Sequence, residues 1–127
     1  MSDFKKQSEA QEVAQKYFDA IASKNVDAAI ALCNEEVTVK SPLGNLTGIK
    51  SFKDFADGFA KMIIKLTPLS ILGWEGKAAI VYIADTYPVQ NSYVAEYLTV
   101  EDGKITSNVT IYDSAPFAEY AAAQQKH

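Results

Sequence analysis

The chain has 127 residues, of which 48% are hydrophobic and 22% are charged, and its formal net charge at pH 7 is -4. This length suits one domain with a hydrophobic core. Because sixteen acidic residues outnumber twelve basic ones and no basic run is present, we expect no nucleic acid partner. Nothing in the sequence resembles a secretory h-region or an apolar run of about 20 residues. The single Cys33 cannot form an internal disulfide. From these three observations we expect a cytoplasmic protein with no membrane partner.

The first half of the sequence predicts three helices and one short strand. Apolar residues recur three and four apart in residues 8–24, in the short segment 26–33 and in residues 49–62. Residues 36–41 alternate between apolar and polar types, which predicts a strand that ends at Pro42.

The second half predicts consecutive strands. Segments 69–74 and 78–86 are rich in β-branched and aromatic residues, and so are 93–100 and 105–112. The last two segments are joined through Asp102-Gly103, which supplies the positive φ that a tight hairpin needs. These segments therefore predict an antiparallel meander.

Together the segments predict a single α+β domain over residues 1–127. Three N-terminal helices cover one face of a curved antiparallel sheet, and the Ala-rich segment that ends at Gln125 forms a short C-terminal helix. Residues 1–7 and 126–127 are expected to fray. The strand 78–84 is apolar on both faces, yet the helices can cover only one face of the sheet. We therefore predict a homodimer in which a second copy covers the outer face.

One acidic residue stands out in the strand 93–100. Alternation places Glu96 on one face with Val94 and Leu98. A carboxylate among apolar neighbours is costly unless it is paired, protonated or solvated in a pocket. Glu96 therefore either lines a pocket, lies at an open edge of the sheet, or pairs with a lysine.

Five short segments are informative through their order and spacing along the chain. They are Tyr17-Phe18-Asp19-Ala20-Ile21, Asn25-Val26-Asp27-Ala28-Ala29-Ile30, Glu35-Glu36-Val37-Thr38-Val39, Ser41-Pro42-Leu43-Gly44 and Thr47-Gly48. Together they resemble the nuclear transport factor 2-like superfamily, which has a cone-shaped α+β fold and includes ketosteroid isomerases and SnoaL-like polyketide cyclases. One fold hosts many functions, so the resemblance implies the fold more than the activity.

The isomerase branch implies roles for three positions. Its tyrosine that donates to the substrate oxyanion falls on Tyr17, and its protonated aspartic acid falls on Glu96. Its general-base aspartate falls on Ser41, whose hydroxyl cannot accept a proton as a carboxylate does, so the usual isomerase base is missing. From the residues alone, we favour another interpretation of Tyr17, as an aromatic residue on the buried stripe of its helix.

The resemblance also implies which residues of the last strand line a pocket. Its register points Asn108, Thr110 and Tyr112 inward. Simple alternation gives the opposite result, because it would bury the apolar set Ile105, Val109 and Ile111. A slip of one residue in the strand register exchanges the inward-pointing set with the outward-pointing set. We favour the register of the family.

These observations predict a SnoaL-like protein whose mainly apolar pocket binds a small, largely apolar molecule. If it is an enzyme, the resemblance implies a cofactor-free isomerase or cyclase with Glu96 as the proton-transfer group, Tyr17 as the donor, and a substrate site at Ser41, Asn108, Thr110 and Tyr112. No cluster of His, Cys or carboxylate residues has metal spacing, so we expect no metal and no cofactor. The alternative is a non-catalytic dimeric module that binds a protein or sequesters a ligand.

Overall fold

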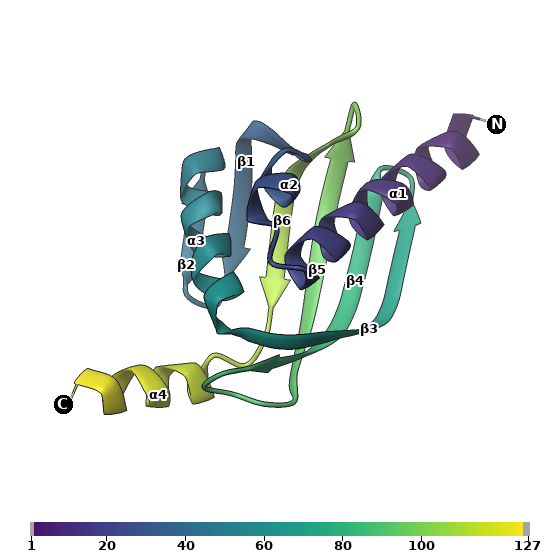
Figure 1. Ribbon diagram of the computed structural model, residues 1–127. Coiled ribbons are helices and arrows are strands. Elements are labelled where there is room, and N and C mark those ends of the chain that lie inside the picture. The colour runs from purple at the N-terminus through teal and green to yellow at the C-terminus, as the bar shows by residue number, and fades with distance from the viewer. Residues whose placement is uncertain (1, 126–127) are drawn as a thin grey trace.

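The computed structural model describes residues 2–125, with side chains for residues 9–123, as four helices and six strands (Figure 1). The first residue and residues 126–127, part of the segments expected to fray, lie outside the described residues, whereas residues 2–7 belong to the first helix. The elements are α1 (Ser2–Ala22), α2 (Val26–Ile30), β1 (Cys33–Ser41), β2 (Gly44–Thr47), α3 (Ile49–Met62), β3 (Ile63–Trp74), β4 (Lys77–Thr86), β5 (Ser92–Glu101), β6 (Lys104–Ile111) and α4 (Ala115–Gln125).

The strands form one sheet in the order β2-β1-β6-β5-β4-β3. Helices α1, α2 and α3 lie on one face of it, and α4 extends from one end (Figure 1). The α+β class is confirmed, with three helices against the sheet and a short C-terminal helix, although β1 and β2 come before α3 in the chain. The expectation of a wholly antiparallel sheet is wrong at one place, because β1 and β6 pair in parallel. After β1 the chain forms β2, α3 and the three strands β3, β4 and β5. It then forms β6, which lies beside β1 and runs in the same direction.

Two element boundaries differ from the sequence prediction. Asn25 caps α2 as its residue type predicts, but α2 ends at Ile30, and Cys33 already belongs to β1. The backbone amide of Ile105 donates to the carbonyl of Leu32, so pairing with β6 outweighs the local helical pattern. Strand β3 is longer than predicted and includes Pro68, which an edge strand tolerates.

Helix α1 packs directly against the edge strand β3. The side-chain amide of Gln11 donates to the carbonyl of Ile71 (2.9 Å) and accepts from the backbone amide of Gly73 (2.6 Å). A Cβ atom at Gly73 would lie 2.3 Å from the backbone nitrogen of Gln11, so only glycine lets the helix lie this close to the strand. Among the described residues, no helix has both the length and the hydropathy that a membrane crossing requires.

Strand β6 contains a bulge that decides which of its side chains point inward. Thr99 of β5 pairs with Ser107, and the next residue, Val100, pairs with Ile105, which leaves Thr106 without a counterpart on β5. An extra residue of this kind changes the face that all later residues occupy.

The bulge means that each of the two proposed registers holds for part of β6. Ile105 is buried, as simple alternation predicts. Beyond the bulge, Asn108 and Thr110 are buried on the inner face, while Val109 is half-buried and Ile111 is exposed on the outer face. The register of the family therefore applies to the residues that matter for a pocket.

Candidate functional site

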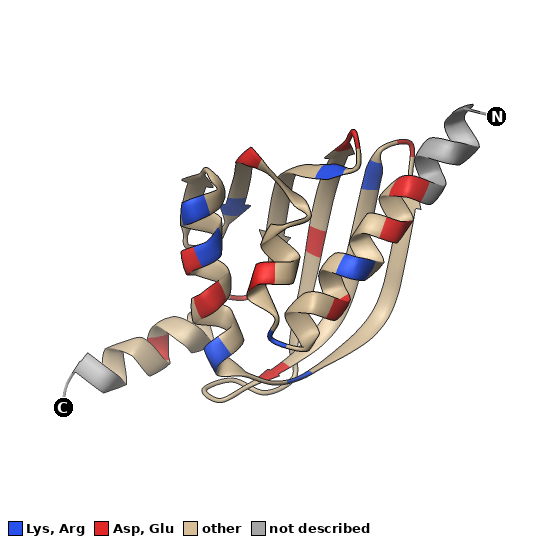
Figure 2. Ribbon diagram, turned by 45° about the horizontal axis from the view of Figure 1, so that its top comes forward, with Lys and Arg blue, Asp and Glu red and all other residues tan. Residues whose placement is uncertain are grey.

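A buried carboxylate lies at the centre of the inner face of the sheet. Glu96 lies midway along β5 and is 5% exposed. Figure 2 shows an acidic segment midway along that strand. The hydroxyl of Tyr17 donates to its Oε1 (2.8 Å), the hydroxyl of Tyr82 to its Oε2 (2.6 Å), and the Nδ2 of Asn108 to its Oε1 (2.8 Å). Strand β5 lies inside the sheet, so Glu96 is not at an open edge. Among the described residues no lysine pairs with it, so the alternative of a lysine partner is also wrong.

The hydrogen bonds continue from Asn108 to a fifth residue. Thr110 Oγ1 donates to Asn108 Oδ1 at 2.6 Å, and Asn108 Nδ2 also lies 3.4 Å from the hydroxyl oxygen of Tyr17. Within the described part of the chain, no buried side-chain nitrogen or oxygen lacks a partner. We call these five residues, Tyr17, Tyr82, Glu96, Asn108 and Thr110, the polar network. A fully satisfied network of this kind can be retained in an apolar interior.

Four elements bring the network together. Tyr17 lies on the buried stripe of α1, and its ring is 6.3 Å from that of Phe52 on α3. The ring of Tyr82 on β4 packs edge-on against the ring of Phe18, with 5.3 Å between the ring centres. Glu96 is the direct cross-strand partner of Thr110, and side chains at paired positions share a face of the sheet.

Burial strongly affects the titration of the two tyrosines. Desolvation, followed by the nearby Glu96 charge, raises the pKa of Tyr17 and of Tyr82 well above the ordinary value for tyrosine. Both hydroxyls therefore remain protonated at neutral pH and act as donors to the carboxylate. Burial also raises the pKa of the Cys33 thiol to about 12, which makes it a poor nucleophile.

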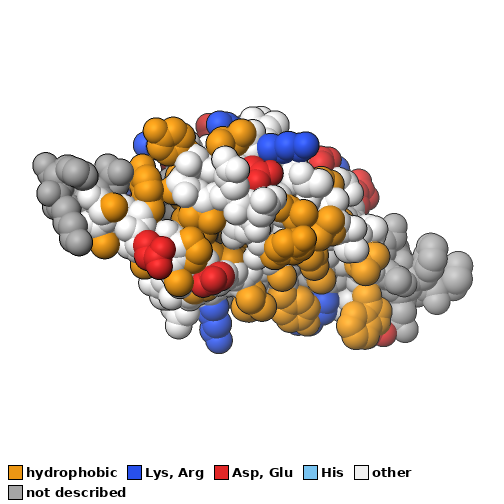
Figure 3. Space-filling model, turned by 90° about the horizontal axis from the view of Figure 1, so that it is seen from below, with side chains coloured by type: hydrophobic (Ala, Val, Ile, Leu, Met, Phe, Trp, Pro, Cys, Tyr) orange, Lys and Arg blue, Asp and Glu red, His pale blue; other side chains and the backbone are white. Residues whose placement is uncertain are grey.

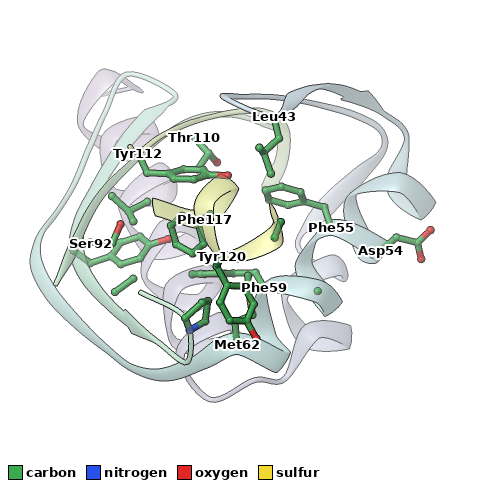
Figure 4. A pocket seen from close by; sticks show the side chains of 16 residues that line it. Leu43, Asp54, Phe55, Phe59, Met62, Ser92, Thr110, Tyr112, Phe117 and Tyr120 are labelled. Carbon is green, nitrogen blue, oxygen red and sulfur yellow. The ribbon is translucent and has the colours of Figure 1, made fainter. Parts of the chain in front are cut away.

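A cavity of about 470 Å³ lies beside the network, between α3, the sheet and α4 (Figure 4). Its lining is mainly apolar and aromatic. Asp54 is at its rim, and Figure 4 shows that its carboxylate points away from the cavity. The side chains that project into it include Phe55, Phe59 and Met62 from α3, Phe117 and Tyr120 from α4, and Tyr82, Val94 and Thr110 from the sheet, with Tyr112 directly after it.

The structure brings most of the predicted site residues together. Thr110 and Tyr112 line the cavity, side by side on one wall (Figure 4). Tyr17, Glu96 and Asn108 do not line it; they lie further inside and connect to it through Tyr82 and Thr110.

Ser41 lies apart from this group. It is the last residue of β1, next to the turn that leads to β2, and is not among the residues that line the cavity. Its hydroxyl donates to the carbonyl of Gly44 and accepts from the amide of Leu43, so it stabilises the turn.

Sequence reasoning did not identify Tyr82 or the aromatic residues of α4 as site residues. Tyr82 lies on β4, beside the strand that carries Glu96, and an aromatic residue in an apolar strand predicts only packing in the core or at an interface. Phe117 and Tyr120, three residues apart on α4, both line the cavity. Such spacing on one helix face was the available signal. Within the described residues, no group of three His, Cys, Asp or Glu side chains is arranged to hold a metal ion.

Replacing Tyr17 by Phe is expected to lower the free energy of unfolding by about 1.5–3 kcal/mol, because a buried carboxylate loses one donor. Tyr87→Phe is the matched control, since Tyr87 is 75% exposed, and it should change stability by less than about 0.5 kcal/mol. Urea unfolding followed by circular dichroism measures both. Equal stabilities for the two variants would contradict the assigned role of Tyr17.

Stability is also expected to fall at high pH. The pKa values of Tyr17, Tyr82 and Cys33 are higher in the folded than in the unfolded chain. As pH rises above about 9–10, the unfolded chain loses these protons first, so the free energy of unfolding decreases, whereas it is unaffected by these groups at lower pH. Urea unfolding between pH 7 and 11 checks this. Tyrosinate absorbance should show that at least two of the seven tyrosines ionise only on unfolding. If all seven ionise near the ordinary pKa of tyrosine while the protein is still folded, the prediction is wrong.

Comparison with known proteins places the chain in a family. The sequence matches the SnoaL-like domain over residues 14–108. No curated protein matches it. A crystal structure of a Kribbella flavida protein is similar with a TM-score of 0.86 and 29% identity, over 93% of this chain and 98% of that one.

Two more distant crystal structures show the same fold. A candidate ketosteroid isomerase, also from Kribbella flavida, has a TM-score of 0.76 and 20% identity, over 86% of this chain and 81% of its own. A candidate polyketide cyclase from Sinorhizobium meliloti has a TM-score of 0.70 and 18% identity, over 78% of this chain and 93% of its own. The chain therefore belongs to the SnoaL-like domain family and has the nuclear transport factor 2-like fold, as its short sequence matches implied.

Proposed function

We propose that this protein binds a small, largely apolar molecule in the cavity between α3, the sheet and α4. The observation that carries this proposal is the cavity itself. Its volume of about 470 Å³ lies within the usual range of about 300–1,000 Å³ for small-molecule sites. Its lining combines aromatic walls with a few hydroxyl groups, which is typical of sites that hold an apolar ligand and orient it through one or two polar groups.

Binding without chemistry is the simpler use of this geometry. Glu96 accepts hydrogen bonds from three donors and does not line the cavity. A general base must come within hydrogen-bond reach of the proton that it removes. Tyr82 would first have to move aside for Glu96 to meet a ligand.

A cofactor-free isomerase or cyclase is the second candidate, with Glu96 transferring the proton and Tyr17 donating. One observation favours it, because Tyr82 both lines the cavity and binds Glu96, so the carboxylate is one side chain away from a ligand. The names of two structural neighbours, a candidate ketosteroid isomerase and a candidate polyketide cyclase, are consistent with such chemistry. Conversion of a bound compound that Glu96→Gln abolishes without loss of binding would favour this candidate.

Filling the cavity is expected to abolish ligand binding. Gly58 lines the cavity on α3, and a Cβ atom there would meet nothing within 4 Å, so Gly58→Leu adds bulk to open space. Lys50→Leu, on an exposed position of the same helix, is the control. A thermal-shift panel of aromatic, terpenoid, polyketide-like and steroid compounds measures binding. A compound at a concentration of a hundred times its dissociation constant should raise the free energy of unfolding by about 2.7 kcal/mol for the natural protein and for Lys50→Leu. It should not raise the free energy of unfolding of Gly58→Leu.

Two results would contradict the proposal. The first is the absence of any stabilising compound across the panel. The second is a compound that stabilises Gly58→Leu as much as the natural protein, since it would have to bind outside the cavity. Either result would shift weight to the non-catalytic protein-binding module.

We also propose that a second copy covers the outer face of the sheet. Cross-strand pairing puts Leu72, Ala79, Tyr97 and Val109 in one row across four strands, and Val81, Ala95 and Ile111 in the next row. Tyr97 is 44% exposed and Ile111 59% exposed in the single chain. A continuous apolar face of this size is uncommon on a monomer.

Hydrophobic side chains are also exposed outside these rows. Figure 3, a view from below, shows hydrophobic side chains over much of this side of the molecule, with acidic and basic side chains among them. Exposed large hydrophobic residues outside the two rows include Leu69 and Tyr87. Tyr87 lies in the connection between β4 and β5, away from the paired rows, so it offers a comparison for residues of the outer face.

Tyr97→Lys is expected to convert a dimer into a monomer, because it places a charge in the centre of the apolar rows. Tyr87→Lys makes the same chemical change outside the rows, so the mass of the assembly in solution should stay that of a dimer. Sedimentation equilibrium at micromolar concentration measures both. If the natural protein is already a monomer, the homodimer is wrong and the outer face becomes a candidate site for another protein.

A further inference from the structure

The directions of the hydrogen bonds in the polar network limit what the cavity can accept. Tyr17, Tyr82 and Asn108 all donate to the side-chain oxygens of Glu96. This orients the Asn108 amide with Nδ2 toward Glu96 and Oδ1 toward Thr110. The threonine hydroxyl must then donate to Asn108, at 2.6 Å.

Two members of the network, Tyr82 and Thr110, also line the cavity. Each hydroxyl has a single proton, and in both residues that proton is used inside the network. Their oxygens therefore retain acceptor capacity and have no proton left for a ligand. The arrangement is the reverse of an oxyanion site, in which tyrosine and acid protons point at the ligand.

The other hydroxyls of the lining do not share this restriction. Ser92, Tyr112 and Tyr120 bring hydroxyls that lie outside the network, so they can rotate to donate or accept. A ligand hydroxyl can donate to the network end of the cavity and accept from one of these three residues. A ligand carbonyl or ether can only accept, so it leaves the network oxygens without a donor.

We propose that the cavity selects apolar molecules that carry a hydrogen-bond donor, such as an alcohol or a phenol, over carbonyl and ether analogues of the same shape. The inference rests on the proposed function, since it specifies the ligand of the same cavity. Thr110 is the residue that sets the preference, because its side chain belongs both to the network and to the lining of the cavity.

Two matched pairs of probes test this inference. Borneol and camphor share one bicyclic skeleton and differ in an alcohol against a ketone, and 2-naphthol and 2-methoxynaphthalene differ in a phenol against an ether. Isothermal titration calorimetry gives a dissociation constant for each. We expect the donor-bearing member of each pair to bind about twofold to tenfold more tightly, which is the ratio that one neutral hydrogen bond contributes.

Substitution of Thr110 assigns the preference to its source. In Thr110→Val the ratio within each pair should fall to about one, because the acceptor is lost, whereas Thr110→Ser keeps the hydroxyl and should keep the ratio. A ratio taken within one variant does not depend on how stable that variant is. Melting curves of both variants, recorded without ligand, confirm that the measured protein is folded.

The possible outcomes are distinguishable. Equal binding, or tighter binding of the ketone and ether, overturns the inference and leaves the proposed function intact. A donor preference that persists in Thr110→Val also overturns it, since another group would then set the preference. Failure of all four probes to bind overturns the proposed function in this size class, and the inference with it.

Discussion

The buried carboxylate of Glu96 imposes the strongest constraint on this structure. A charge in the middle of a sheet face is tolerated only with several donors, and these come from α1, β4 and β6. The helix, the two neighbouring strands and their register must therefore be correct together. Removal of one partner from such a group leaves the others unsatisfied, so the network specifies one packing of helix against sheet.

The cavity depends on the same arrangement. Tyr82 and Thr110 form the boundary between the network and the cavity, so the hydrogen bonds that satisfy Glu96 also fix part of the wall. The remaining wall comes from aromatic and apolar side chains of α3 and α4. The cavity thus has one end made of hydrogen-bonded polar side chains and a larger apolar part.

Much of the fold could be predicted from the sequence, because it follows from local patterns. Helical spacing located α1 and α3, and alternation correctly put Glu96 on one face of β5 with Val94 and Leu98, which the structure shows to be buried. The resemblance to a known family brought Tyr17 and Glu96 together, and the structure joins them by a hydrogen bond. These features depend on neighbours in sequence or on a pattern shared across the family.

The features that could not be predicted depend on pairings between distant residues. The bulge at Thr106 is visible only in the alignment of β5 with β6, and it decides the inner face of β6. The parallel pairing of β1 with β6 follows from how the chain returns across the sheet. Tyr82 gave no sequence signal because an aromatic residue in an apolar strand is usually explained by packing alone.

The contact between Gln11 and β3 has a consequence for how this protein meets other chains. Strand β3 is an edge, and an unpaired edge offers backbone groups to strands of other molecules. The Gln11 amide donates to one backbone carbonyl and accepts from one backbone amide, as a neighbouring peptide unit would. A helix side chain therefore occupies the place of a seventh strand at this point, and it blocks strand addition where β3 would otherwise recruit a foreign chain.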